Sequence, residues 1–485
     1  MKTVRLFAVS LWLTLPAAGA AAEPAGRYLA GKNELSGNAP ETITRRQAAE
    51  DTEFFAEIMR GGYAALATLR EKDRGAGSFL SGLAEKARTL PEPVSVEALL
   101  DTLAGPLGVF RDTHLSLSYR RADGSYSARS PTPRQRAYLL APPEPYEELV
   151  SCGGMEGARL RYPFLRKDGE GVAVSSAMVF FSPRQEGKID CAVRRGGRLV
   201  EAAAKLRRHR FDPDERDPVF FMQDGDVPVL RLGSLDLGRT GDMDAFVRSA
   251  VKLRSSQSFV LDVRGNHGGS DLSVDAWLET LSGPDGLKPE EKGASRFLLG
   301  PVTLQGLLNS IAGLGDSPQV QKLSEFVRGK QKGVGASQKP VFVNADKFWG
   351  KIVGEINVPA DKAAAAYRGS VVILADSVCA SSCEDLVVKL RGRLKARVLL
   401  VGQNTSGTGD YGELGTYVLP HSRIRVMLST TQYKNGPGFT EGRGYLPDFW
   451  IAEEDPLPAA KAAAFCLRDK NCAMERLGFG AAGGL

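Results

Sequence analysis

The sequence predicts an α/β layered domain that follows a helical region and a small β-rich region. From residue 226 onwards, short apolar runs typical of strands alternate with stretches that have helical spacing. Residues 41–112, in contrast, show helical spacing alone. The 485 residues are 42% hydrophobic and 25% charged, which is typical of a globular protein with more than one domain. A chain of this length can bury a large core.

The first segment, MKTVRLFAVSLWLTLPAAGAAAEP, has two positive charges, then an apolar stretch, then small residues in an A-x-A arrangement. This order is typical of a secretory signal peptide, which we expect over residues 1–22 with cleavage near Ala20 to Ala22. Pro16 and Gly19 end the apolar stretch before it reaches the length of a membrane anchor. We therefore expect an exported protein without stable membrane insertion, secreted or, in a Gram-negative bacterium, periplasmic.

The next region, residues 23–112, is predicted to be helical. TEFFAEIMRGGYAALATL has aromatic and aliphatic residues at helical spacing. SVEALLDTLAGPLGVF has Ser95 as its N-cap, and the helix bends or ends near Pro106. These apolar positions are interpreted as core.

Residues 113–225 are predicted to form a β-rich region. Short alternating runs such as LSLSYRR, GVAVSSAMVFF and CAVRRGG are separated by turns rich in proline and glycine.

The α/β layered domain is expected over residues 226–452. The predicted strands VPVLRL, SFVLDVRG, SVVILAD and ARVLLVG alternate with helical stretches, of which SCEDLVVKLRGRL is the clearest. A long insertion rich in glycine and lysine, residues 283–345, separates the second of these strands from the third. Residues 453–485 are interpreted as a C-terminal tail.

The charge pattern argues against nucleic acid as a partner. The formal net charge is +6, and +4 remains when Lys2 and Arg5 of the expected signal peptide are left out. The basic run RRHR (207–210) is short and is interpreted as a solvated helix end.

Six cysteines, an even number, favour disulfides in an exported chain. A zinc site at the CASSC motif would need two further ligands, and none lies at suitable spacing nearby, so we expect no metal and no cofactor. Pairing by proximity predicts three disulfides: Cys152–Cys191, Cys379–Cys383 and Cys466–Cys472.

The stretch ADSVCASSCEDLVVKL (375–390) is predicted to form a strand, a tight turn and a helix. Ser381 and Ser382 then lie at the helix N-terminus, where backbone N–H groups are unpaired and negative charge is stabilised. Two interpretations remain at this point. One serine is an ordinary N-cap, or it is a nucleophile whose neighbouring N–H stabilises an oxyanion.

A nucleophilic serine needs a base, and two of the four histidines are candidates. His114 begins a predicted strand, and the neighbouring Asp112 and Thr113 are positioned to orient its ring. His267 lies in the glycine-rich turn RGNHGGS, and spacing does not distinguish the two. Of the other two histidines, His209 is interpreted as solvated, and His421 as part of a turn between strands.

The turn that contains His267 is also a candidate anion site. Gly268 and Gly269 allow a close approach of the backbone with N–H groups exposed. The alternative is a tight turn without a ligand.

Four segments together resemble a known family. In the same order, they occur in tail-specific, C-terminal-processing serine peptidases and in their tricorn-core and interphotoreceptor-retinoid-binding-protein relatives. The resemblance covers roughly residues 226–452, with a looser match to DTHLSLSY before it. It implies a crotonase-like α/β fold and hydrolysis of proteins or peptides through an acyl-enzyme. The segments are LDVRGNHGG (261–269), VVILADSVCASSCEDLV (371–387), VLLVGQNTSGTGDYGE (398–413) and FTEGRGYLPDFWI (439–451).

The resemblance implies a role for several residues of the serine turn. In the family the nucleophile lies three positions before an acidic residue, which selects Ser381, before Glu384, over Ser382. The oxyanion donors would be the N–H groups of Gly268 or Gly269 and of Ser382.

The resemblance also implies the base. Members with a serine–lysine dyad have a lysine where this chain has Thr408, so that arrangement is excluded. The tricorn-like branch uses a histidine after a hydroxyl residue, and a glutamate before G-x-G-x-x-P-D. These positions match His114 as general base, with Thr113 and Glu441 as orienting groups. The alternative for Glu441 is an ion pair with Arg443.

Other interpretations remain open. The family often carries a PDZ module, but residues 145–225 lack its G-x-x-x-G-D-x-I pattern, so a degenerate module or none is expected. The chain could also be an inactive peptidase-fold protein that binds a peptide or hydrophobic ligand, or an enzyme with His267 as base. A third interpretation, a purely structural protein, would not explain why the four segments occur in this order.

Overall fold

The computed structural model describes most of the chain, and the expected signal peptide lies outside the described residues. Within the described ranges, no helix is long and apolar enough to cross a membrane. The ranges are residues 28, 30, 35–72, 76–141, 148–169, 171–183, 187–211, 219–225, 227–236, 239–282, 295–335, 337–356 and 367–468.

The N-terminal region is helical, as predicted. The side chain of Thr44 caps the first long helix, and Ser95 caps the last by accepting a hydrogen bond from the Ala98 N–H at 3.2 Å. This last helix passes directly into a 3-10 helix that has Pro106 in its first turn. The elements are α2 (Arg45–Gly62), α3 (Ala64–Lys72), α4 (Ala76–Arg88), α5 (Val96–Ala104), the 3-10 helix Gly105–Phe110, and the short strands β1 (Thr42–Ile43) and β2 (Val94–Ser95).

The α/β layer is built on five parallel strands. Helices α6, α7 and α11 pack on one face and α12 on the other, so the strands are buried on both sides. Helix α12 lies in the segment that we expected to be a tail. In sheet order the strands are β12 (Val219–Asp224), an antiparallel edge, then β13 (Val227–Leu232), β14 (Ser258–Asp262), β17 (Ser370–Ala375), β18 (Val398–Gly402) and β21 (Phe449–Ile451). The helices are α6 (Thr240–Leu253), α7 (Leu272–Ser282), α11 (Ser382–Leu394) and α12 (Leu457–Cys466).

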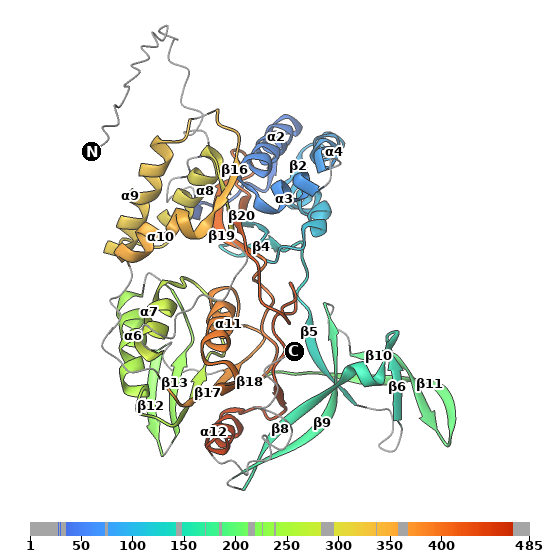
Figure 1. Ribbon diagram of the computed structural model, residues 1–485. Coiled ribbons are helices and arrows are strands. Elements are labelled where there is room, and N and C mark those ends of the chain that lie inside the picture. The colour runs from blue at the N-terminus through green and yellow to red at the C-terminus, as the bar shows by residue number, and fades with distance from the viewer. Residues whose placement is uncertain are drawn as a thin grey trace, which may run out of the picture.

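A second, antiparallel sheet lies beside the N-terminal helices (Figure 1). Two of its strands, β3 and β4, open the segment expected to be the β-rich region, yet β3 pairs with β20, and β4 pairs with β3 at the edge of this sheet. Its strands are β16 (Val341–Asn344), β15 (Arg296–Leu299), β20 (Arg425–Gln432), β3 (Ser116–Arg120) and β4 (Tyr126–Arg129), with β19 (Tyr411–Val418) also paired to β20.

The insertion at 283–345 contains more structure than its glycine and lysine content indicated. Its described part forms two strands of the second sheet and two helices, and a third helix starts where it ends. A small core of their own stabilises them, in which the rings of Phe297 and Phe348 stack with centroids 4.3 Å apart. The helices are α8 (Pro301–Ala312), α9 (Pro318–Lys332) and α10 (Ala345–Ile356).

The remaining strands form the β-rich region, which extends away from the layered domain in Figure 1. They continue the first sheet, because β21 pairs in parallel with β8. In the described part of the region the helical structure is one 3-10 turn, Gly157–Leu160. The strands are β5 (Arg136–Ala141), β6 (Glu148–Cys152), β7 (Met155–Glu156), β8 (Arg161–Asp168), β9 (Gly171–Ser182), β10 (Lys188–Arg195) and β11 (Arg198–Arg208).

His209 is not solvated, and the prediction of a solvated helix end at RRHR was wrong. Strand β11 ends just before His209, which is 6% exposed and packs beside Trp450. Its Nε2 lies 2.5 Å from the backbone oxygen of Ile451. Burial lowers the pKa of this imidazole to about 4. The apolar neighbours come from distant strands, so the local arginines gave no indication of them.

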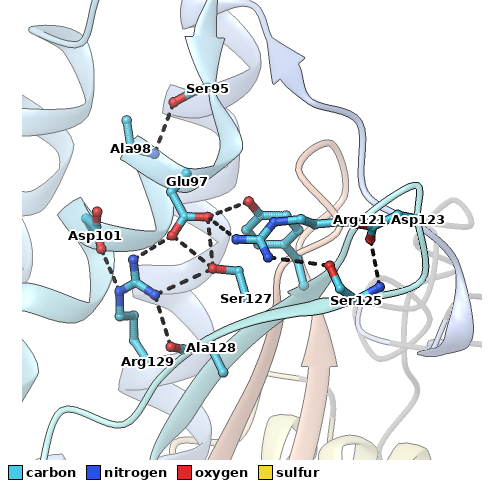
Figure 2. Close-up of polar contacts among 11 residues, drawn as sticks. Ser95, Glu97, Ala98, Asp101, Arg121, Asp123, Ser125, Ser127, Ala128 and Arg129 are labelled. Carbon is cyan, nitrogen blue, oxygen red and sulfur yellow. Dashed lines mark hydrogen bonds and ion pairs between the residues drawn. The ribbon is translucent and has the colours of Figure 1, made fainter.

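A polar cluster joins helix α5 to strands β3 and β4 (Figure 2). The Glu97 carboxylate accepts hydrogen bonds from the Tyr119 hydroxyl at 2.6 Å, from Ser127 at 2.8 Å, and from Arg129 at 2.5 Å. The Tyr119 hydrogen bond makes the largest contribution to lowering the pKa of Glu97, to about 2. The cluster joins the end of β3, the strand that His114 precedes, to α5 and β4.

Candidate active site

Ser381 lies in a tight turn between β17 and α11 and has an unusual backbone conformation. Its φ is 56° and its ψ is −121°. An ordinary N-cap residue has extended backbone angles, and a positive φ is uncommon outside glycine. Ser381 is the N-cap residue of α11 by position, and Glu384 accepts its N–H, but its backbone angles are not those of an ordinary cap. A strained strand-to-helix turn that presents a serine is instead typical of a nucleophile elbow.

Several contacts hold this strained turn in place. The predicted disulfide between Cys379 and Cys383 is present, and both cysteines are fully buried around Ser381. The Ala380 N–H donates to the backbone oxygen of Asn266 at 3.1 Å, which joins the serine turn to the glycine turn. Strained backbone persists only where its surroundings determine it in this way.

Glu384 is the main polar support of the serine turn. Its buried carboxylate accepts hydrogen bonds from the Ser381 N–H at 3.2 Å, the Gly407 N–H at 2.8 Å and the Thr408 N–H at 2.7 Å. The Thr405 hydroxyl donates to it at 2.5 Å. Burial raises the pKa of Glu384, and these hydrogen bonds oppose that rise.

The supporting role of Glu384 was not predicted, because in the sequence this residue only marks the position of Ser381. A signal was present, because the segment TSGT offers closely spaced backbone and hydroxyl donors. The two segments are far enough apart in sequence that spacing alone did not bring them together.

The glycine turn packs directly against the serine. A Cβ on Gly268 would lie 2.5 Å from the Ala380 oxygen and 3.0 Å from the Ser381 Cβ, so this position excludes a side chain. The Gly268 N–H donates to the side chain of Asn266 at 2.8 Å and is therefore occupied.

The amides of Gly269 and Ser382 are better placed as oxyanion donors. Within the described ranges neither N–H has a hydrogen-bond acceptor. The Ser382 hydroxyl donates to the Gly269 carbonyl at 2.9 Å, so the two residues are joined to each other. Of the two glycines proposed as donors, the geometry favours Gly269 over Gly268.

Thr113 and Glu441 are in contact, although 328 residues separate them in sequence. The Thr113 hydroxyl donates to Glu441 Oε1 at 2.7 Å, and the Thr113 N–H donates to the same oxygen at 2.9 Å. Glu441 Oε2 accepts from the N–H groups of Gly409 at 3.1 Å and Asp410 at 2.9 Å. Glu441 thus holds the residue before His114 against the 409–410 segment.

The alternative of an ion pair between Glu441 and Arg443 does not match the structure. The Arg443 guanidinium lies 5.3 Å from the centre of the Phe181 ring and donates to the Thr440 hydroxyl at 3.3 Å. Burial raises the pKa of Glu441 to about 7, against the effect of its four donors.

The His114 ring is partly buried, and its Nδ1 is fully enclosed without a well-aligned hydrogen-bond partner in the described part of the chain. Burial lowers the pKa of His114 to about 4; the nearby Tyr411 backbone raises it and the positive charge of Arg134 lowers it further. At neutral pH the imidazole is therefore uncharged and able to accept a proton.

Asp112 does not orient the His114 ring, contrary to expectation. Its carboxylate accepts the backbone N–H of His114 at 2.9 Å, so it fixes the main chain instead. The carboxylate is fully buried, which raises its pKa to about 6.

One glycine connects the serine side of the site to the histidine side. The Gly407 N–H donates to Glu384, and the Gly407 carbonyl oxygen lies 3.0 Å from the Thr113 hydroxyl, within reach of the same proton that Glu441 accepts. Its φ is +77°, and a Cβ there would lie 2.2 Å from the Arg443 nitrogen. The segments that carry Ser381 and His114 therefore meet on opposite sides of a single residue.

The other histidines lie outside this network. His267 is solvent-exposed in the glycine turn. His421 lies in a turn between β19 and β20, as predicted, and its Nε2 is 2.7 Å from a carboxylate oxygen of Glu50.

Two of the three predicted disulfides are present. Cys152 pairs with Cys191 between β6 and β10, and Cys379 pairs with Cys383, which excludes the zinc alternative there. The Cys466–Cys472 pair was also predicted, but Cys472 lies outside the described residues. Groups of acidic, histidine and cysteine side chains that could hold a metal ion are not found in the described ranges.

Comparison with family models identifies the layered domain. The model of peptidase family S41 matches residues 226–451. These residues belong to peptidase family S41. A search of curated protein sequences found no match. The S41 match runs from the start of β13 to the end of β21 and includes Ser381, Glu384 and Glu441, whereas Thr113 and His114 precede it.

Several solved structures are similar to the chain at low sequence identity. Mature CPAF is 17% identical with a TM-score of 0.43, over 87% of this chain and 96% of that chain. The photosystem II D1 C-terminal processing protease is 12% identical with a TM-score of 0.37, over 87% and 98%. The tricorn protease is 12% identical with a TM-score of 0.39, over 88% of this chain and 37% of that chain.

The S41 assignment gives the reaction class. The protein is a serine-type peptidase, a hydrolase whose substrates are proteins or peptides. The predicted α/β fold class is confirmed.

Proposed function

We propose that this S41 peptidase is an exported endopeptidase that works through an acyl-enzyme on Ser381, with His114 as general base. The observation that carries the proposal is the shared contact at Gly407, which lies between the support of Ser381 and the support of His114. A nucleophile and its base must lie within hydrogen-bond reach when they react, and the contacts of Gly407 with Glu384 and Thr113 support this pairing by bringing the two segments to one residue.

The proposed acylation begins when the Ser381 oxygen attacks the substrate carbonyl carbon while His114 takes the hydroxyl proton. The carbonyl oxygen becomes negatively charged and accepts hydrogen bonds from the Gly269 and Ser382 amides. The carbon–nitrogen bond then breaks, and the imidazolium of His114 gives its proton to the leaving amine.

Deacylation repeats these steps with water. His114 takes a proton from the water as its oxygen attacks the acyl carbon. The ester bond to Ser381 then breaks, and the serine oxygen recovers its proton from His114. The enzyme is regenerated and a carboxylic acid is released.

Thr113 and Glu441 are proposed to position His114. They hold the backbone next to the imidazole, and Asp112 holds the His114 N–H. A positioned neutral imidazole accepts a proton without first rearranging, which lowers the barrier of the chemical step.

Export is supported by the disulfides. Disulfides persist in oxidising compartments and are rare where thiols are kept reduced. Both described pairs join buried cysteines within the folded chain, and the expected signal peptide provides the route. The fraction of the protein recovered outside the cytoplasm, with and without residues 1–22, tests this part.

The nucleophile is tested with a fluorophosphonate probe, which reacts with activated serines. The wild-type protein should be labelled and should hydrolyse an unfolded protein such as casein. Ser381→Ala should abolish labelling and lower kcat by about 10⁴-fold or more.

Ser377→Ala is the matched control, because this serine lies in the same turn without a role in the proposed chemistry. It should keep both labelling and hydrolysis. Unchanged labelling of Ser381→Ala would remove the assignment. A folded wild-type protein that neither reacts nor hydrolyses would favour the ligand-binding alternative.

A further inference from the structure

A pocket of about 420 Å³ lies beside the proposed active site. It is formed by the start of β19 and by the segment that follows β20. Its walls include three aromatic rings and one carboxylate, and the lysine beside them is exposed at the rim. The lining residues include Asp410, Tyr411, Tyr433, Lys434, Asn435 and Phe439.

The pocket is joined to the catalytic groups by direct contacts. The Asp410 N–H donates to Glu441, which holds Thr113. The backbone of Tyr411 lies close enough to the His114 ring to raise its pKa. A side chain bound in the pocket would therefore lie near the residues that hold His114.

The carboxylate in the pocket lacks a cation. Asp410 is half-buried, and one of its oxygens accepts a hydrogen bond from the Asn435 side chain at 2.8 Å. Among the described residues no cation lowers its pKa, and Lys434, which also lines the pocket, is exposed. Burial raises the pKa of Asp410, which is the expected effect when a carboxylate is partly desolvated without a counter-ion.

The surroundings of Asp410 favour a cation further. Tyr411, Tyr433 and Phe439 belong to the pocket lining, and aromatic rings can attract positive charge and pack against aliphatic chains. The Tyr433 hydroxyl also donates to Glu413 at 2.9 Å, so a second carboxylate lies near the same wall. The pocket thus combines aromatic rings with a negative group, which matches the stem and the head of a basic side chain.

We infer that this pocket is a substrate subsite for lysine or arginine side chains and that Asp410 determines this specificity. The inference rests on the proposed peptidase function and names its substrate class, namely peptides with a basic residue near the cleaved bond. The masses of the cleavage products show which bond is cleaved, and therefore how many residues separate the basic side chain from that bond.

The test compares two peptides that differ only in charge at one residue, lysine or the uncharged norleucine. The wild-type enzyme should cleave the lysine peptide with a kcat/KM at least about 10-fold higher, since hydrogen bonds to charged groups have this strength. Asp410→Asn should reduce the lysine-to-norleucine ratio by about 10-fold. Asp190→Asn, an exposed carboxylate in the β-rich region, is the matched control and should keep the ratio.

A binding measurement separates this inference from the proposed function. Fluorescently labelled lysine and norleucine peptides are titrated onto the Ser381→Ala protein, with circular dichroism to verify folding. The lysine peptide should bind about 10-fold more tightly, and the additional Asp410→Asn change should remove the difference, whereas Asp410→Glu should retain part of it.

The outcomes are distinct. Hydrolysis and Ser381 labelling without a lysine preference would overturn the subsite while leaving the peptidase mechanism intact. An unchanged lysine-to-norleucine ratio in Asp410→Asn, in cleavage and in binding, would also overturn it. Lysine-selective binding without any hydrolysis would support the pocket and contradict the proposed function.

Discussion

The serine side and the histidine side of the site are built in opposite ways. The serine side is local: one strand, one turn and one helix hold Ser381, and the Cys379–Cys383 disulfide closes the turn. The histidine side depends on contacts between distant segments, since Thr113 reaches Glu441 across 328 residues of sequence.

The two sides nevertheless use the same device. Glu384 and Glu441 are carboxylates that each accept four hydrogen bonds, and the donors of both include backbone amides of the segment 407–410. This segment therefore sets the position of one side relative to the other. A change in the backbone conformation of segment 407–410 should therefore lower kcat more than a change on the serine side or the histidine side alone.

The largest expected effect is loss of the base. His114→Ala should lower kcat by about 10⁴-fold, because removal of a triad member leaves only binding and oxyanion stabilisation. His267→Ala is the matched control and should change kcat by less than about 10-fold. Steady-state hydrolysis of a peptide measures both, and the opposite ranking would assign the base to the glycine turn.

Next in size are the two supporting carboxylates. Glu384→Gln and Glu441→Gln should each lower kcat by about 100-fold, because an amide presents N–H groups where only acceptors fit. Glu384→Gln should also lower the free energy of unfolding by about 2–4 kcal/mol, since Glu384 is 3% exposed. Urea unfolding and hydrolysis measure the two effects. Wild-type rates in both variants would contradict a positioning role.

The two disulfides should separate activity from stability. Replacing Cys379 and Cys383 with alanine should lower kcat by about 10-fold through the Ser381 turn and destabilise the fold by about 2 kcal/mol, because the closed loop is short. Replacing Cys152 and Cys191 should destabilise it by about 4 kcal/mol, since that pair spans 39 residues, and should leave kcat unchanged. Equal losses of activity would show that the turn does not need its disulfide.

The smallest effect concerns protonation. The pKa of His114 and that of His209 are each lowered to about 4, so both side chains should be uncharged at neutral pH. The unfolded chain binds more protons on these groups between about pH 4 and 6.5, so their contribution to stability rises with pH in this window and is lost as pH falls through 4.

Nuclear magnetic resonance measures this directly, because the chain has only four histidines. Two signals should titrate near pH 4, and His114→Gln and His209→Gln assign them. Glu441 has the opposite effect: burial raises its pKa to about 7, so its contribution to stability falls as pH rises from about 4.5 to 7 and the loss is complete above 7. A His114 signal that titrates near 6.5 would contradict the enclosed ring.

The sequence was most informative where structure is local. The strand–turn–helix around Ser381, the glycine turn and two cysteine pairs are present as predicted. The strained φ of Ser381 was not predictable, because it depends on the disulfide and on Glu384 together.

The sequence was least informative where distant segments meet. Nothing near His209 in the chain indicated burial beside Trp450, and the glycine and lysine content of 283–345 concealed the helices that share a core around Phe297. The pocket at Asp410 was missed for the same reason, since its walls come from two strands and a loop that only the fold brings together.

In the proposed mechanism, Ser381 and His114 act at the same peptide bond of the substrate. A crystal structure of the protein after reaction with a peptidyl phosphonate tests it most directly. The account predicts a phosphorus–oxygen bond to Ser381, an oxygen held by the amides of Gly269 and Ser382, and the His114 ring within about 3.2 Å of the adduct. Modification of another residue, or a His114 ring beyond hydrogen-bond reach with a different base in its place, would contradict it.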